Sequence, residues 1–145
     1  MEQIVRRLRK TCAKTRKGLS RKLGMSLRLV ASGAFRTVYS ISDKPLVIKI
    51  PHCRGALAHA RQEHKMIKRL KRRVPELMPE VLHFNHKTGV AVHRKYSRVG
   101  VTSRHSDKAE QILRSKKLPY GDMHYGNVAL DGAVVKVIDL GCFRP

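Results

Sequence analysis

Three oxygen-bearing side chains near the end of the sequence have the residue types and spacing of a divalent metal site. Asp122 and Asn127 lie five residues apart, and Asp139 follows the second of two short apolar runs. Asp131-Gly132 separates those runs and predicts a two-residue type I′ hairpin turn. The hairpin should place Asn127 and Asp139 at the same open end. Magnesium prefers carboxylate and amide oxygens, so we expect these two residues to bind Mg²⁺ and Asp122 to accept a hydroxyl proton.

A lysine, a glutamate and a glycine-containing turn further upstream suit the handling of phosphate. Lys49 lies near the end of the β-prone run Leu46–Ile50 and is expected to reach nucleotide phosphates as a cation. Glu63, on the following predicted helix, is placed to hold Lys49 by an ion pair. Ser32-Gly33-Ala34 would let main-chain N–H groups approach phosphate. Phosphoryl transfer requires positioning and charge neutralisation of this kind, which makes ATP and Mg²⁺ the expected cofactors.

The segment YGDMHYGNVALDGAVVKVIDLG, Tyr120 to Gly141, resembles the catalytic and metal-binding loops of the protein-kinase-like superfamily. There, a catalytic Asp is followed by Asn, a hairpin and a second Asp before Gly. The G-D-x-H-x-x-N form of this segment is closer to the aminoglycoside and choline kinases and to atypical bacterial kinases than to kinases with the H-R-D motif. The resemblance implies that Asp122 is the catalytic base, that Asn127 and Asp139 hold metal, and that His124 lies near the transferred phosphate.

The upstream segments are similar to the same superfamily in the same order. LVASGAFRTVY resembles the glycine-rich loop, with Gly33 at its central glycine and Ala34 next to it, although Ala31 and Arg36 replace the flanking glycines. VIKI resembles the third-strand motif that supplies Lys49, and Glu63 matches the helical glutamate. The resemblance covers about residues 27–141.

Two departures from the superfamily bear on activity. The sequence given stops at Pro145, shortly after Asp-Leu-Gly, without an activation segment or later C-lobe helices, and Tyr120 stands where many members have His.

We expect an ATP-dependent phosphotransferase that acts on a protein Ser/Thr hydroxyl. The alternative is a catalytically weak or inactive kinase-like binding module whose basic surface holds nucleic acid or an acidic protein.

The elements that must position these residues predict an α+β, protein-kinase-like fold: a five-stranded antiparallel N-lobe with one helix, and a minimal C-lobe of a helix, the catalytic loop and a β-hairpin. Strands are expected at 27–30, 35–41, 46–50, 81–84 and 90–93, and hairpin strands at 128–130 and 133–138. Helices are expected at 2–17, 54–73 and 106–117, with Gly18 and Gly24 interrupting the first and Ser106 capping the last. The domains would be a basic N-terminal segment (1–26), an N-lobe (27–96) and a truncated C-lobe (97–145).

Charge is the strongest compositional feature, with 32 Lys and Arg against 10 Asp and Glu and a net charge of +22. Such an excess attracts polyanions. We therefore expect a nucleic-acid or acidic-protein partner beside ATP and a protein phosphoacceptor. The alternative interpretation is that these cations only form a solvated surface. The candidate surfaces are the basic N-terminal segment and the basic face of residues 61–73, with Arg61, Lys65, Lys68, Arg69, Lys71, Arg72 and Arg73.

Apolar runs and cysteines bear on location. No run approaches the roughly 18 apolar residues of a membrane span, and no secretory signal is recognised. Cys12, Cys53 and Cys142 are odd in number and widely spaced, which is typical of a reducing cytoplasm. Short kinase-like chains of this kind also resemble bacteriophage products, which act in a bacterial host. The histidines lack zinc-ligand spacing, so no structural zinc is expected.

Overall fold

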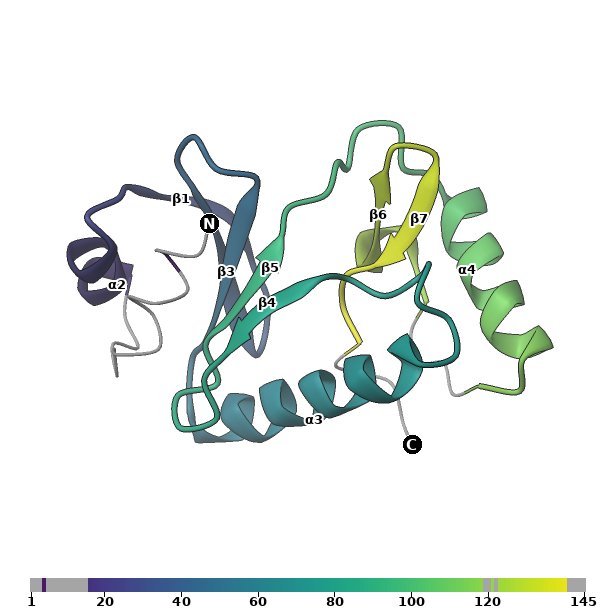
Figure 1. The fold of residues 1–145 in the computed structure, drawn as a ribbon, viewed down its shortest axis with the longest axis horizontal. Helices are drawn as coiled ribbons and strands as arrows, with labels where there is room; N and C mark the ends of the chain where they lie inside the picture. The colour runs from purple at the N-terminus through teal and green to yellow at the C-terminus, as the bar shows by residue number, and fades with distance from the viewer. Residues whose placement is uncertain (1–3, 5–15, 119–120, 122, 141–145) are drawn as a thin grey trace. The chain divides into compact units, whose positions relative to one another are not determined.

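The computed structural model describes residues 4, 16–118, 121 and 123–140 (Figure 1). The chain divides into two compact units. The first unit comprises Met1–Arg61 and Glu80–Lys95, and the second unit comprises Gln62–Pro79 and Tyr96–Pro145. The division falls within helix α3 (Arg54–Lys71), whose two halves belong to different units.

A five-stranded antiparallel sheet forms the first unit, with the strand order β1-β2-β3-β5-β4. This confirms the predicted number and direction of strands. The observed ends lie within two residues of the predicted ones, because alternating β-branched residues and turn-forming residues mark each strand. The strands are β1 (Leu27–Ser32), β2 (Arg36–Ile41), β3 (Leu46–Pro51), β4 (Val81–Phe84) and β5 (Ala91–Arg94).

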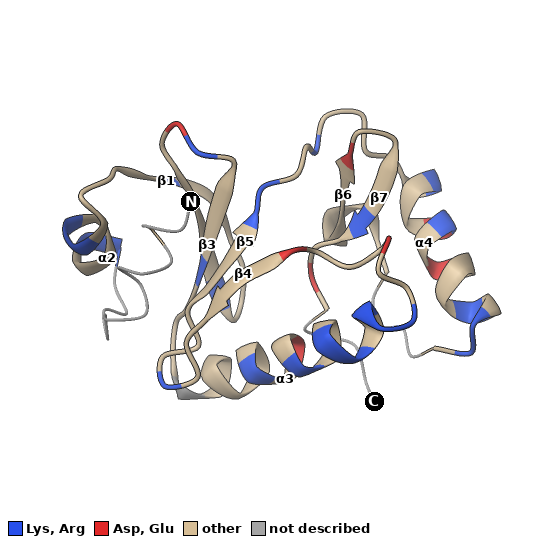
Figure 2. Ribbon diagram, viewed as in Figure 1, with Lys and Arg blue, Asp and Glu red and all other residues tan. Residues whose placement is uncertain are grey.

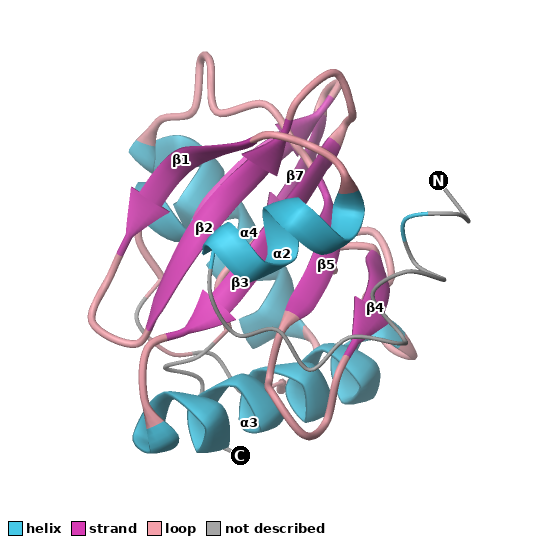
Figure 3. Cartoon of the chain, turned by 90° about the vertical axis from the view of Figure 1, so that its left-hand side faces the viewer, coloured by secondary structure: helices cyan, strands magenta, loops and turns pink. Residues whose placement is uncertain are grey.

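Helix α2 (Arg16–Leu23) lies across one face of this sheet (Figure 3). Leu19 and Leu23, one turn apart, are fully buried in the same apolar cluster as the sheet residues Leu27, Ile41 and Ile48. Burial of each leucine contributes roughly 1.5–3 kcal/mol, which exceeds the ~1 kcal/mol cost of a helical glycine. The prediction that Gly18 interrupts a helix is therefore wrong.

The end of helix α2 is set by the next glycine. Gly24 has a φ of 65°, and its amide donates to the carbonyl of Ser20 at 2.9 Å. This is the left-handed position in which glycine commonly ends a helix, so the prediction that Gly24 breaks the helix is confirmed. The predicted helix over 2–17 falls almost wholly outside the described residues.

Helix α3 buries one stripe of side chains and exposes a basic one. The buried stripe contains Ala56, Ala60, Glu63, Ile67 and Leu70. Ala60, Ile67 and Leu70 were predicted, whereas Ala56 and Glu63 are buried in place of Leu57 and His64, which are half-buried. The helix ends at Lys71 rather than at residue 73, because Pro75 disfavours helical backbone at the preceding residue.

The second unit contains helix α4 (Ser103–Ser115), a 3₁₀ turn η1 (Tyr125–Asn127) and a hairpin of β6 (Val128–Asp131) and β7 (Val134–Val137). Helix α4 begins three residues earlier than expected. Thr102 is its N-cap, and His105 Nδ1 accepts a hydrogen bond from the Thr102 amide at 3.0 Å. The predicted cap Ser106 is instead a buried helix residue whose hydroxyl donates to the carbonyl of Ser103 at 2.7 Å.

The hairpin turn also differs from the prediction by one residue. Asp131 pairs with Val134 in the ladder, so the two turn residues are Gly132 and Ala133. Gly132 has a φ of 61°, and Ala133 is not among the positive-φ residues. A positive φ at only the first turn position is typical of type II′ turns, which favour glycine there. The type I′ prediction is therefore wrong, although the hairpin itself is confirmed.

None of the helices in the described part of the chain is both long enough and apolar enough to cross a bilayer.

Candidate active site

The open end of the β6–β7 hairpin brings together two of the residues expected to bind metal. The Ile138 amide donates a hydrogen bond to the Asn127 carbonyl at 2.8 Å, which extends the ladder by one pair beyond Val128 and Val137. Asp139 follows immediately, and the side chains of Asn127 and Asp139 are both half-buried. The two residues thus lie at one end of the ribbon, as local hairpin geometry predicted. Asp122, the expected proton acceptor, lies outside the described residues.

The η1 turn sets the backbone just before Asn127. The Asn127 amide donates to the His124 carbonyl at 2.9 Å, and the Gly126 amide donates to His124 Nδ1 at 3.0 Å. A Cβ added to Gly126 would lie 2.7 Å from that nitrogen, so only glycine allows this close approach. Because Nδ1 accepts a hydrogen bond here, the neutral ring of His124 carries its hydrogen on Nε2.

The donor chemistry of Asn127 and Asp139 fits magnesium better than zinc. Both offer oxygen, and Mg²⁺ is commonly held by one or two protein oxygens together with waters and substrate phosphates. Within the described ranges, no three His, Cys, Asp or Glu side chains gather in a way that would hold a metal ion. A magnesium site here would therefore combine Asn127 and Asp139 with oxygens from a bound nucleotide.

Lys49 lies in the central strand of the first unit. It pairs with Val38 on β2 and with Ala91 on β5, and its side chain is 7% exposed. Among the Lys and Arg side chains that the structure describes, only Lys49 and Arg36 are buried. Lysine is almost never fully buried without a partner, so the position of Lys49 differs from that of an ordinary surface cation.

Glu63 is the matching exception among the acids. It lies on the buried stripe of α3 and is 3% exposed, whereas every other acidic side chain in the described ranges is half-buried or exposed. A buried carboxylate requires ion pairing or hydrogen bonding. Burial therefore sets Lys49, Glu63 and Arg36 apart from the other charged residues of the described ranges, without reference to any motif.

The β1–β2 turn is the segment expected to approach phosphate. Ser32, Gly33, Ala34 and Phe35 are all exposed, and the Gly33 amide donates to the carbonyl of Arg36 at 2.9 Å. Gly33 is not among the glycines with a positive φ. A Cβ added to Gly33 would meet only the Arg36 carbonyl, at 4.0 Å. Neither backbone conformation nor packing against described residues therefore requires glycine at this position.

Comparison with known proteins identifies the fold. No protein-family model and no curated protein sequence matches the chain. The ADP-bound crystal structure of aminoglycoside phosphotransferase APH(2'')-Ib is similar to it, with a TM-score of 0.63 and 12% identity over 92% of this chain and 72% of that one. The streptomycin–ATP–APH(2'')-IIa ternary complex gives a TM-score of 0.59 and 12% identity over 88% of this chain and 71% of that one. The chain has a protein-kinase-like fold.

In this kinase-like fold the five-stranded sheet corresponds to the N-lobe, and the predicted fold class is confirmed. His52, beside the β1–β2 turn, was missed as a functional candidate, because the histidines of the sequence were weighed only as zinc ligands. Its ring Nε2 lies 2.9 Å from the Gly33 carbonyl oxygen. The predicted antiparallel pairing of β2 with β3 was a sufficient signal, because it places the residue after Pro51 opposite the turn.

Proposed function

We propose that the protein is an ATP-dependent phosphotransferase that uses Mg²⁺. The observation that carries the proposal is the hydrogen bond from the Ile138 amide to the Asn127 carbonyl, which places Asn127 and Asp139 at one end of the hairpin. The kinase-like fold supports it, because the similar structures hold ADP or ATP.

The residues at the hairpin divide the work of the reaction. Asn127 and Asp139 hold Mg²⁺, which when bound neutralises charge on the nucleotide phosphates. Asp122 accepts the proton of the acceptor hydroxyl while the oxygen of that hydroxyl forms a bond to the γ-phosphorus. The bond from that phosphorus to the bridging oxygen breaks, and ADP leaves. His124 keeps Nδ1 on the Gly126 amide and presents Nε2–H as a donor to a phosphate oxygen.

One residue of the sheet and one of α3 are assigned to the nucleotide phosphates. Lys49 contacts the phosphates as a cation, and Glu63 pairs with Lys49. The burial of each, at 7% and 3% exposed, supports this assignment, because buried charges are stable only when paired or hydrogen-bonded. The β1–β2 turn that contains Gly33 and Ala34 supplies main-chain amides that donate to phosphate oxygens.

The proposed phosphoacceptor is a Ser/Thr hydroxyl on a protein. Streptomycin is bound in one of the similar structures, but aminoglycosides carry several protonated amines at neutral pH. A chain with a net charge of +22 repels such a polycation and attracts an acidic partner. Acidic residues around the accepting hydroxyl are therefore expected to improve the substrate.

The test is transfer of labelled γ-phosphate in the presence of Mg²⁺, comparing wild type with Asp122→Ala and Asp139→Ala. We expect labelling of an acidic Ser/Thr-containing protein such as casein, no labelling of streptomycin, and loss of transfer in both variants. Equal labelling by all three proteins contradicts the proposed roles of these residues. Labelling of streptomycin instead of the protein contradicts the proposed acceptor.

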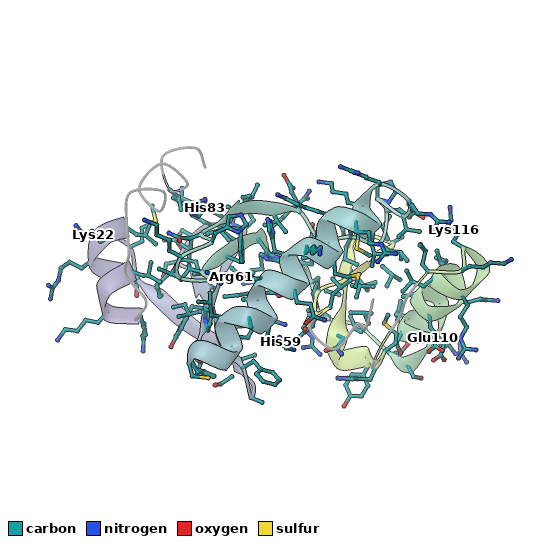
Figure 4. The ribbon with its side chains drawn as sticks, turned by 90° about the horizontal axis from the view of Figure 1, so that it is seen from below. Lys22, His59, Arg61, His83, Glu110 and Lys116 are labelled. Carbon is teal, nitrogen blue, oxygen red and sulfur yellow. The ribbon has the colours of Figure 1, made fainter. Side chains whose placement is uncertain are left out.

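A second function is binding of a polyanion, favoured by the Lys and Arg residues that recur along α3 (Figure 2). Five exposed cations along and just after this helix form a stripe, which we call the α3 stripe. The stripe spans three helical turns, or about 16 Å at 1.5 Å per residue. Figure 4 labels Arg61, whose Nε and NH2 both donate to the carbonyl of His86, at 3.0 and 2.7 Å. A regular row of cations suits the repeated phosphates of nucleic acid; binding only to an acidic protein is the competing outcome. The stripe consists of Arg61, Lys65, Lys68 and Arg69 on α3 and Arg72 in the turn directly after it.

A further inference from the structure

His52 extends the sheet beyond the end of β3. The pairing of β2 with β3 matches Arg36 with Pro51, and the next residue, His52, donates its amide to the Phe35 carbonyl at 3.1 Å. The main chain of His52 is therefore tied to the tip of the β1–β2 turn. This places its imidazole beside the turn rather than along the remainder of the sheet.

The ring of His52 makes two further contacts with the same turn. Nε2 lies 2.9 Å from the Gly33 carbonyl oxygen, and Nδ1 lies 3.4 Å from Thr37 Oγ1. A carbonyl oxygen only accepts, so Nε2 must carry the hydrogen, and Nδ1 of the neutral ring accepts from Thr37. Thr37 Oγ1 is in turn 3.4 Å from Ser32 Oγ. The imidazole thus connects both sides of the turn.

These contacts affect the polarity of the turn. The carbonyls of Gly33 and Phe35 both accept hydrogen bonds from His52. The amides of Ala34 and Phe35, in contrast, donate to no acceptor among the residues that the structure describes. A turn in which two carbonyls are occupied and two amides are available favours an anion over a cation.

A ring stack supports the tip from α3. The Phe35 ring lies over the ring of His59, with centroids 4.2 Å apart and planes at 16° (Figure 4 labels His59). Phe35 is nonetheless 44% exposed. The stack thus holds the tip of the turn against α3 while Phe35 stays accessible to solvent.

We propose that His52 is a positioning residue that holds this turn by binding the Gly33 and Phe35 carbonyls, so that the Ala34 and Phe35 amides donate to the phosphates of ATP. This inference rests on the proposed nucleotide-dependent function. It means that a side chain outside the turn, His52, determines the conformation of the phosphate-binding turn. Replacing His52 should therefore affect the binding of phosphate-bearing ligands and leave the binding of the nucleoside unchanged.

Two substitutions separate the ring contacts. His52→Gln places an amide nitrogen near the position of Nε2 and keeps a donor for the Gly33 carbonyl, whereas His52→Ala removes both ring contacts. His86→Ala is the control, because His86 is another exposed histidine of the first unit and lies in the loop between β4 and β5, where its ring contacts Phe84.

The experiment measures affinity for ATP and for adenosine in the full chain, together with amide hydrogen exchange of residues 33–37 without nucleotide. For His52→Ala we expect about tenfold weaker ATP binding, which corresponds to the loss of roughly one hydrogen bond, unchanged adenosine binding and faster exchange in the turn. His52→Gln should bind ATP within about threefold of wild type, the range expected when the main hydrogen bond is kept. His86→Ala should match wild type.

Three results overturn the inference, and they are distinguishable. Equal ATP affinity in wild type and His52→Ala refutes the role of His52 while leaving the proposed function intact. Parallel losses of ATP and adenosine affinity show that the substitution damages the first unit generally. A wild-type protein that binds no ATP contradicts the proposed function and, with it, any phosphate role for His52.

Discussion

Asn127 and Ile138 are joined by a 2.8 Å hydrogen bond from the Ile138 amide to the Asn127 carbonyl. The bond closes the β6–β7 hairpin at the end opposite its turn, and Asp139 is the next residue along the chain. The same ribbon carries Asp131 at its other end, where it pairs with Val134 beside the turn. One hairpin therefore has an aspartate at each end, but only Asp139 lies beside Asn127.

The two aspartates should differ in their effect on magnesium-dependent activity. Asp139→Asn removes a negative charge from the proposed metal site, and we expect the transfer rate to fall by roughly 10²-fold or more, as when a group that stabilises transition-state charge is lost. Labelled-phosphate transfer across a Mg²⁺ titration measures this effect. Asp131→Asn makes the same chemical change at the turn end and should stay within about twofold of wild type, because it keeps the shape of the side chain and lies at the opposite end of the hairpin from the proposed metal site. Similar losses of transfer rate in both variants would show that activity depends on the hairpin as a whole and not on a metal site at its open end.

Two glycines should respond to alanine in opposite ways. Gly33 has open space and no positive φ, so Gly33→Ala should keep the wild-type melting temperature while weakening ATP binding, since the added methyl group obstructs phosphate. Gly89 has a φ of 71°, and an added Cβ would lie 2.8 Å from Leu57 Cδ1 and 2.9 Å from Pro51 Cγ. Gly89→Ala should therefore lower the free energy of unfolding by about 1–3 kcal/mol.

Thermal unfolding and ATP titration of the two glycine variants provide the measurements. The decisive comparison is Gly33→Ala, because no contact in the described chain explains a glycine there. If that variant binds ATP as wild type does, the turn does not approach phosphate.

Local chemistry explains which features the sequence predicted. The open end of the hairpin was predictable because Asn127 and Asp139 need only the pairing of adjacent runs. The turn itself was misplaced because Asp131-Gly132 and Gly132-Ala133 both satisfy hairpin turns, and only the ladder register decides between them. Gly18 was misjudged because its cost is outweighed by tertiary burial of its helix, which a local pattern does not contain.

Burial of charge was the least predictable property of the site. The helical pattern of α3 placed His64 on the inner face, yet Glu63 is the side chain that is 3% exposed. Hydrophobic periodicity assigns a carboxylate to the solvent side by default. A role for Glu63 was expected from its place on the helix predicted to follow Lys49 and from the resemblance, and not from hydrophobic periodicity.

The proposed pairing of Lys49 with Glu63 predicts a non-additive effect on stability. Lys49→Met and Glu63→Leu should each lower the free energy of unfolding by about 3 kcal/mol, because each leaves one buried charge without its counterion. The double variant should lose less than either single variant, since it leaves no buried charge uncompensated. Urea unfolding of the four proteins gives the coupling energy, and the Lys49 variants should also fail to bind ATP.

An exposed ion pair provides the control for this cycle. Arg114 NH2 lies 2.7 Å from Glu110 Oε1 on helix α4, and the Arg114 side chain is 61% exposed. The corresponding cycle, Glu110→Leu with Arg114→Met, should give a coupling of only about 0.3–0.5 kcal/mol. A coupling between Lys49 and Glu63 as small as this would rule out a buried pair.

The exposed cations of α3 predict how nucleic-acid binding responds to salt. Each phosphate contact made by a Lys or Arg contributes about 0.7–0.9 to the slope of log affinity against log salt. Replacing Lys65, Lys68, Arg69 and Arg72 with Gln removes four contacts and should lower the slope by roughly 3 units. Glutamine has a similar helix propensity, so α3 should remain folded. Fluorescence anisotropy with a labelled single-stranded oligonucleotide at several salt concentrations measures the slope.

A scattered variant tests whether the α3 stripe acts as a surface or only through net charge. It replaces an equal number of exposed cations outside α3 with Gln, namely Lys44, Arg104, Lys108 and Lys117. Because the overall charge changes equally, a purely non-local attraction lowers the slope equally in both variants. A stripe that contacts phosphates directly lowers it only in the α3 variant. Equal slopes in the two variants would therefore rule out α3 as the binding surface, and a wild-type slope near zero would rule out nucleic-acid binding altogether.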